Sequence, residues 1–168
     1  GINQGFLSSL GESFLALMYE AIDKSDEAVL ITELKDGKVT GFVSGAASLR
    51  PIYLNLMRQF PRLVISLAPV CISPSKAWRI IELLRHIFFP RHRGIGVQQP
   101  PLPEFELLSI SVLSEVRRRG VAKRLYTGLV DYARLNSLNT FKIVVGENLE
   151  GAHDFYLRMG AVPTARIC

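Results

Sequence analysis

The stretch Arg117-Arg118-Arg119-Gly120-Val121-Ala122 stands between an apolar strand-like run, residues 107–112, and a helical pattern over residues 121–135. A glycine that follows a strand and opens a helix lets backbone amides point at one common spot. These amides have no partner inside the helix, and the helix dipole adds about half a positive charge there. Three arginines oppose that dipole, because cations stabilise the other end of a helix. The stretch therefore predicts an anion-binding site, and a solvated basic loop is the alternative.

A second strand-to-helix step follows the first. Residues 141–145 read as a strand, residues 146–149 as a turn and residues 150–159 as a helix, which Gly160 closes. A strand–helix–strand unit of this size predicts two parallel strands joined by a right-handed crossover. Ligands of such sheets bind at the carboxyl ends of the strands. The arginine loop (residues 117–120) and the turn at Gly146 are therefore expected at one edge of the sheet.

The two motifs resemble those of the GNAT superfamily of N-acetyltransferases. Residues 117–122 read R-x-x-G-x-A and resemble the acyl-CoA pyrophosphate loop of that family. Residues 149–160 resemble the family segment N-x-x-A-x-x-F-Y-x-x-x-G, but Leu149 stands where the family has asparagine and Asn148 lies one residue earlier. Over residues 104–162 the resemblance implies an α/β protein with the GNAT acyl-CoA N-acyltransferase fold, a central mixed sheet with helices on both faces.

The resemblance also implies direct transfer of an acetyl group from acetyl-CoA to a primary amine, without a covalent enzyme intermediate. Loop amides would bind the pyrophosphate, basic side chains would add charge, and the preceding strand would pair with the peptide-like pantetheine arm. The implied co-substrate-binding residues are Ile110, Ser111, Val112, Arg117, Arg118, Arg119, Gly120, Val121, Ala122, Lys123 and Asn148. No metal site is indicated. A non-catalytic acyl-CoA-binding or regulatory module is the alternative, which Leu149 keeps open.

Two residues match catalytic groups of that family. Tyr156 matches the tyrosine that protonates the leaving thiolate; its alternative is a core aromatic, although helical spacing favours Phe155 for the core. Glu106 lies six residues before Val112 and matches the glutamate that some members use as general base. Strand alternation predicts Glu106 on the same face as Ile110 and Val112. An edge-strand carboxylate in water is the alternative for Glu106.

The preceding part of the chain reads as a helix and a hairpin. Apolar residues recur at helical spacing over residues 6–22, which contain the capping-box pattern Ser9-x-x-Glu12. Residues 29–34 and 39–46 read as strands around Asp36-Gly37, a pair that indicates a tight hairpin turn. Gly41 and Gly45 would relax the second strand or admit a close neighbour.

Residues 51–103 differ in composition from the rest of the chain. They hold eight of the nine prolines, and seven Lys or Arg against one acid, so the segment carries the whole basic excess. Residues 53–60 and 76–89 read as helices. We interpret the segment as a basic helical insertion in a single domain, residues 1–168. A packed appendage with a solvated rim, or a lid that attracts an anionic or membrane-borne substrate, would fit this composition.

The overall composition, 48% hydrophobic and 21% charged in 168 residues, suits a domain with a real core. Cys71 and Cys168 predict no disulfide framework, and no signal-peptide pattern is found, so we expect a cytoplasmic protein. Compared with the GNAT pattern, the first strand, part of the first helical region and the closing strand are missing. This difference predicts a truncated or partly resolved chain.

The net charge of +5 favours anionic partners. The expected acceptor is an amino sugar, including nucleotide- or lipid-linked ones, a small metabolite or a protein N-terminus. A membrane surface and a homodimer are left open as partners. Nucleic acid is disfavoured, because the aromatic residues of the insertion lie on apolar stripes and do not alternate with its basic residues.

Overall fold

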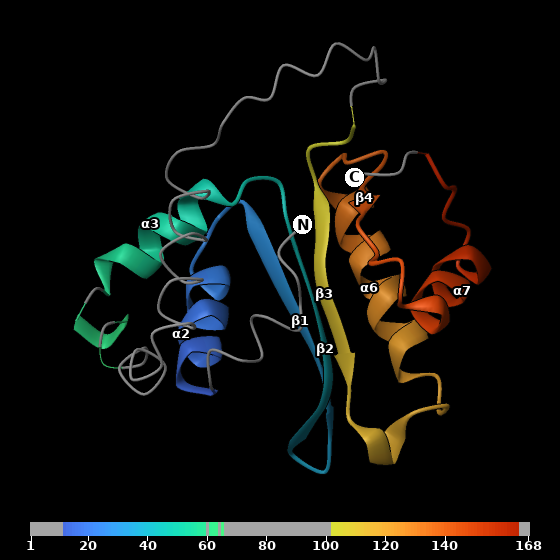
Figure 1. Ribbon diagram of the computed structural model, residues 1–168, viewed down its shortest axis with the longest axis horizontal. Helices are drawn as coiled ribbons and strands as arrows, with labels where there is room; N and C mark the ends of the chain where they lie inside the picture. Colours follow the sequence, from blue (N-terminus) through green and yellow to red (C-terminus); the bar gives the residue numbers. More distant parts are fainter. Residues whose placement is uncertain (1–11, 60, 64, 66–101, 165–168) are drawn as a thin grey trace. The chain divides into compact units, whose positions relative to one another are not determined.

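The computed structural model describes residues 12–59, 61–63, 65 and 102–164 (Figure 1). The chain forms two compact units, which are described separately. The first unit contains Leu30–Ala47 and the chain from Glu104 onward, and the second contains Ile2–Val29 and Ser48–Pro103. All residues expected in catalysis and co-substrate binding belong to the first unit.

A mixed four-stranded sheet forms the centre of the first unit. Its strands are β1 (Ala28–Lys35), β2 (Lys38–Ala46), β3 (Glu106–Val112) and β4 (Lys142–Ile143), in that spatial order. β2 and β3 are antiparallel, whereas β3 and β4 are parallel. Asp36 and Gly37 turn the chain between β1 and β2 in the left-handed conformation, with φ angles of 52° and 73°. The predicted hairpin and the predicted α/β class are confirmed.

Two helices lie side by side next to this sheet, α6 (Val121–Leu135) and α7 (Glu150–Arg158) (Figure 1). α6 has the predicted bounds, and its apolar stripe packs on β2 and β3. The buried residues of α6 are Val121, Leu125, Tyr126, Leu129 and Ala133. β4 is shorter than the predicted strand, because only two of residues 141–145 form sheet pairs.

Two glycines of β2 lie against bulky neighbours. A Cβ atom at Gly41 would lie 3.0 Å from the Leu125 side chain and 3.1 Å from the Val121 side chain, both on α6. A Cβ atom at Gly45 would lie 2.7 Å from the ring of Phe105. The glycines therefore admit close neighbours, which is one of the two roles predicted for them.

The register between β2 and β3 shifts between Ser44 and Gly45. Ser44 pairs with Ser109 and Gly45 pairs with Leu107, so Leu108 is the extra residue of a β-bulge. The hydroxyl groups of Ser44 and Ser109 lie 2.8 Å apart and form a hydrogen bond across the two strands. The bulge therefore interrupts the alternation of side chains along β3.

This bulge decides the face on which Glu106 lies. Cross-strand partners share a face of the sheet. Glu106 pairs with Ala46, on the face of Ser44, whereas Ile110 pairs with Val43, on the opposite face. The prediction that Glu106 shares a face with Ile110 and Val112 is wrong, because strict alternation does not survive the extra residue.

The second unit contains α2 (Glu12–Asp23) and α3 (Arg50–Arg58), which pack against each other. Their buried residues are Phe14, Leu17, Ala21, Ile22, Ile52 and Leu56. α3 begins earlier than predicted, because Pro51 is accommodated in its first turn, where no amide donor is needed. The start of the helix predicted over residues 6–22 and the helix predicted over residues 76–89 lie outside the described residues.

No helix in the described parts of the chain is long and apolar enough to cross a membrane.

We predict that Gly41→Ala lowers the free energy of unfolding by about 1–3 kcal/mol, because the added methyl group overpacks the interface with α6. Denaturant unfolding measures this change. Gly151→Ala is the matched control: no atom lies within 4 Å of its added Cβ, and alanine favours a helix, so this variant should be slightly more stable. Equal stability of Gly41→Ala and wild type would contradict the packing.

Candidate active site

The arginine loop leads from β3 into α6 through two residues in the left-handed conformation. Arg118 has a φ angle of 61° and Gly120 one of 77°. The amide of Arg124 donates to the Gly120 carbonyl at 3.0 Å, which begins the helical hydrogen bonding. In the described part of the chain, no protein group accepts a hydrogen bond from the amides of residues 118–123. These amides can therefore donate to an anion at the positive end of the helix dipole.

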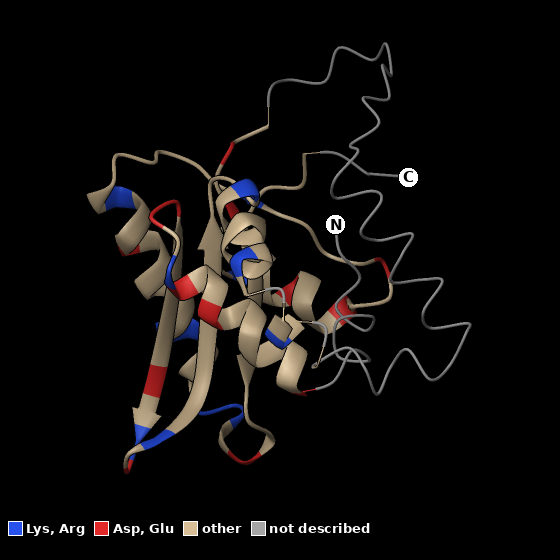
Figure 2. Ribbon diagram, turned by 90° about the vertical axis from the view of Figure 1, so that its left-hand side faces the viewer, with Lys and Arg blue, Asp and Glu red and all other residues tan. Residues whose placement is uncertain are grey.

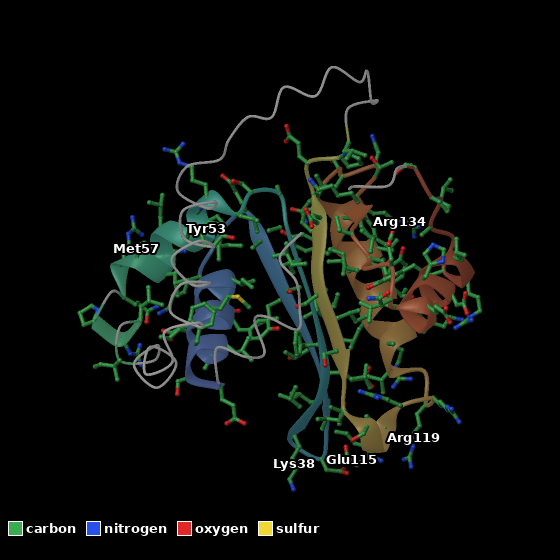
Figure 3. The ribbon with its side chains drawn as sticks, viewed as in Figure 1. Lys38, Tyr53, Met57, Glu115, Arg119 and Arg134 are labelled. Carbon is green, nitrogen blue, oxygen red and sulfur yellow. The ribbon has the colours of Figure 1, made fainter. Side chains whose placement is uncertain are left out.

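Five basic residues of the loop and the first turn of α6 are exposed: Arg117, Arg118, Arg119, Lys123 and Arg124. Figure 2 colours the basic residues blue along the ribbon. Arg119 lies beside the start of α6 (Figure 3). Arg124 forms an ion pair with Glu33 of β1, the only ion pair of the five among the described residues. Arg117 donates from Nε to the carbonyl of Val112 at 3.3 Å. The remaining three side chains form neither kind of contact with a described residue and are available for an anion.

β3 and β4 separate before β3 reaches the arginine loop. Glu106 pairs with Lys142 and Leu107 pairs with Ile143, and β4 ends there. The carboxyl-terminal half of β3, residues 109–112, therefore has no partner strand on its β4 side within the described residues. An open strand edge of this kind offers main-chain groups to an extended, peptide-like ligand.

The main-chain groups of Ile110 and Val112 belong to this open edge. The amide of Leu113 donates to the carbonyl of Thr40 on the β2 side at 3.0 Å. Hydrogen bonding alternates along an antiparallel pair, so Val112 and Ile110 direct their amide and carbonyl groups away from β2. The bond from Arg117 to the Val112 carbonyl agrees with this direction. The structure thus brings the predicted strand residues and the predicted loop to one place.

Glu106 lies at the start of β3 and forms an ion pair with Lys142 of β4 at 3.4 Å. The two side chains are partly buried, with 23% and 31% of their surfaces exposed. The ion pair holds the Glu106 carboxylate beside β4. Glu106 is therefore partly buried and ion-paired, which differs from the alternative of an edge-strand carboxylate in water.

Tyr156 of α7 is buried in a cluster of aromatic rings. Its ring centroid lies 6.1 Å from that of Tyr126 on α6 and 5.3 Å from that of Phe155. Burial, with a smaller effect of Tyr126, raises the pKa of Tyr156 to about 12. Burial also raises the pKa of Tyr126. Both phenols therefore hold their protons at neutral pH, as a proton donor must.

The orientation of α7 differs from the one predicted. Tyr156 is the buried residue, with 8% of its surface exposed, whereas Phe155 is only partly buried. The prediction that Phe155 takes the core is wrong, because α7 is short and both neighbours contact Tyr126 of α6. Whether Tyr156 acts as the acid stays a prediction.

An open pocket of about 460 Å³ lies between the first turn of α6 and α7. It is lined by Lys123, Phe155, Arg158 and Met159, two of which carry a positive charge. Arg158 and Met159 were not among the residues expected at the site from the sequence. Their spacing from Phe155 was the available signal, because residues three and four positions apart share a helix face.

Asn148 and Leu149 lie in the turn before α7 and are both exposed. The amide of Leu149 donates to the carbonyl of Gly146 at 3.0 Å, and Leu149 caps α7 without a side-chain hydrogen bond. The main chain alone therefore forms this turn, and a contact between Asn148 and the co-substrate stays a prediction.

The third strand of the mixed sheet leads into a helix through a basic loop lined with amides, and this loop lies beside an open strand edge. This arrangement is the one that the resemblance to acyl-CoA-dependent N-acyltransferases implied. The family described as Acetyltransferase (GNAT) family matches residues 3–161, and the chain belongs to this family. It is therefore an acyltransferase of the GNAT type, as its motifs suggested.

Solved structures of aminoglycoside acetyltransferases share this fold. AAC(6')-Ih from Acinetobacter baumannii has a TM-score of 0.57 and 14% identity, covering 96% of this chain and 84% of its own. AAC(6')-Iy in complex with CoA has a TM-score of 0.54 and 15% identity, covering 99% of this chain and 92% of its own. Identities this low indicate a common fold only. No curated protein matches the chain.

The raised pKa of Tyr156 predicts a specific alkaline instability. The folded pKa of about 12 exceeds the usual value of 10.0, so the folded state binds the phenolic proton more tightly. The resulting stabilisation is complete below pH 10 and is lost as the pH rises through 12, in total about 3 kcal/mol. Tyr156→Phe should therefore lose less stability than wild type over that range in denaturant titrations. An unchanged pH dependence would contradict the burial of this phenol.

Proposed function

We propose that the chain transfers an acetyl group from acetyl-CoA to a primary amine by direct attack. The observation that carries this proposal is that the amides of residues 118–123, next to the open edge of β3, have no hydrogen-bond partner among the described residues. A pyrophosphate needs several converging donors, and the loop offers them at the positive end of α6. The pantetheine arm needs main-chain partners, and Ile110 and Val112 direct such groups to the open edge.

The charges of the loop fit the same ligand. Acetyl-CoA carries phosphate groups, and three side chains, those of Arg118, Arg119 and Lys123, have no ion pair among the described residues. Ser111 pairs with Phe42 of β2, and its side chain would line the strand edge beside the pantetheine arm.

Two residues would move the protons. Glu106, held by Lys142, would accept the proton that the amine must lose before it attacks. Tyr156 would donate its proton to the thiolate that leaves when the carbon–sulfur bond breaks. Its burial among aromatic rings supports this role, because the phenol stays protonated until a base approaches.

We propose an amino sugar as the first acceptor to test. Structural neighbours are aminoglycoside 6'-N-acetyltransferases, although they share only 14–15% identity with this chain. The basic excess of residues 51–103 supports an acceptor that also carries a phosphate group. We retain the single GNAT domain with this segment as an insertion, and a cytoplasmic location, as parts of the proposal.

An amine panel that includes aminoglycosides and phosphorylated amino sugars, incubated with acetyl-CoA and read by mass spectrometry, tests the activity. With the best acceptor, Tyr156→Phe should lower kcat by about 10²- to 10⁴-fold, because the leaving group loses its acid. Glu106→Gln should lower kcat/KM, because the amine loses the group that accepts its proton. Tyr132→Phe and Glu104→Gln are the controls with the same chemical changes. CoA binding without transfer to any amine would favour the non-catalytic module instead.

The pocket between α6 and α7 suggests how the nucleotide end of CoA is bound. We propose that the adenine ring packs on Phe155 and Met159, and that Lys123 and Arg158 bind the 3'-phosphate. Both cations line the pocket, and Lys123 also belongs to the first turn of α6, beside the loop amides.

Arg158→Gln should weaken CoA binding by about tenfold and leave the binding of dephospho-CoA unchanged, because only CoA carries the 3'-phosphate. Calorimetric titration with the two nucleotides measures the difference. Arg134→Gln, at the other end of α6, is the control. A variant that still distinguishes CoA from dephospho-CoA as well as wild type does would rule out this role.

A further inference from the structure

Arg124 differs from the other cations of the loop, because all three nitrogens of its guanidinium group donate to protein oxygens. Nε donates to Oε2 of Glu33 at 3.1 Å, and Nη2 donates to Oε1 of the same carboxylate. Nη1 donates to the main-chain carbonyl of Arg119 at 3.2 Å. One side chain thus connects β1, the arginine loop and the first turn of α6.

Electrostatics alone does not favour a cation such as Arg124 in the first turn of α6. A cation in the first turn of a helix opposes the helix dipole, and four more basic residues are close in sequence. Glu33 supplies the one carboxylate that pairs with this group in the described part of the chain. The Arg124 side chain is 58% exposed, and exposed ion pairs contribute little to global stability. The contact to Arg119 indicates a local role.

That contact fixes the orientation of one peptide group. The Arg119 carbonyl points at Nη1 of Arg124, and a trans peptide places the amide of Gly120 on the opposite side. The guanidinium also lies against Gly120, because a Cβ atom there would be 3.3 Å from Nη1. Glu33 is itself held, since Thr40 Oγ1 donates to its main-chain carbonyl at 3.0 Å. These contacts connect the β1–β2 hairpin to the arginine loop and set the direction in which the Gly120 amide points.

We propose that Glu33 and Arg124 form a positioning pair that sets the arginine loop in its diphosphate-binding conformation. The inference rests on the proposed function, because it takes CoA as the ligand of the loop. Arg124 acts as a positioning residue in this proposal, since each of its three nitrogens donates to a protein oxygen of β1 or of the loop.

Glu33→Gln distinguishes positioning from direct contact by the sign of its effect. If Arg124 bound phosphate, loss of the competing carboxylate would free a cation and tighten CoA binding. Positioning predicts weaker binding, by about fivefold to thirtyfold, with a raised KM for acetyl-CoA and an unchanged kcat. Arg124→Gln should weaken CoA binding by the same factor. The double variant should weaken it no further, because each single change already disrupts the same pair. Arg124→Lys keeps the charge but loses the fork, and should also weaken binding.

Hydrogen exchange of the free chain gives a second measurement that does not depend on CoA. The hydrogen-bonded amides around the loop, those of Arg117 and Arg124, should exchange faster in Glu33→Gln than in wild type, while the interior of α6 is unchanged. Asp131→Asn is the matched control, because it removes another ion pair of α6, with Arg134 at 3.7 Å, far along the helix from the loop.

Calorimetric CoA titrations of the four variants and wild type decide the matter. Equal or tighter binding by Glu33→Gln, with unchanged exchange of the loop, would overturn the positioning pair and leave the proposed function intact. A wild-type chain that binds no CoA would overturn the proposed function. In that case the exchange rates alone would show whether the pair holds the loop.

Discussion

The close packing of α6 against β2 is the constraint on which the site depends. α6 follows β3 after one short loop, so its amino-terminal end must lie near the carboxyl end of β3. Gly41 lets Val121 and Leu125 approach the sheet, and these buried residues fix the rotation of the helix. A helix held further from β2 would carry its unpartnered amides away from the open edge of β3.

The charges of the loop oppose the stability of the fold. The first turn of α6 contains Lys123 and Arg124 and no acid, although anions are the groups that stabilise this end of a helix. Only Glu33, from another strand, offsets one of these charges in the described residues. An arrangement that breaks a local rule without local compensation is typical of a binding site, because the missing anion arrives with the ligand.

Local patterns were sufficient for some features and not for others. The bounds of α6 and the hairpin at Asp36-Gly37 follow from periodicity and turn chemistry, which act over a few residues. The bulge at Leu108 lies inside an apolar run and carries no turn residue that would reveal it. The Glu33–Arg124 pair joins residues 91 positions apart, and many other charged pairs were equally compatible with the sequence. Tertiary packing decided each of these.

The bulge also changes how the two candidate proton-transfer groups relate to the sheet. Glu106 lies on the face of Ser44, whereas α6 packs on the opposite face, beside Gly41. Tyr156 contacts Tyr126 of α6 and so belongs to the α6 side. β3 and β4 separate after Leu107, and within the described residues no strand pairs with β3 on that side beyond this point. In the proposed reaction, an amine would approach the acyl group from the face of Glu106, and the thiolate would leave toward the face of Tyr156. With strict alternation along β3, Glu106 would lie on the α6 side together with Tyr156, so the single extra residue places the two candidate groups on opposite faces of the sheet.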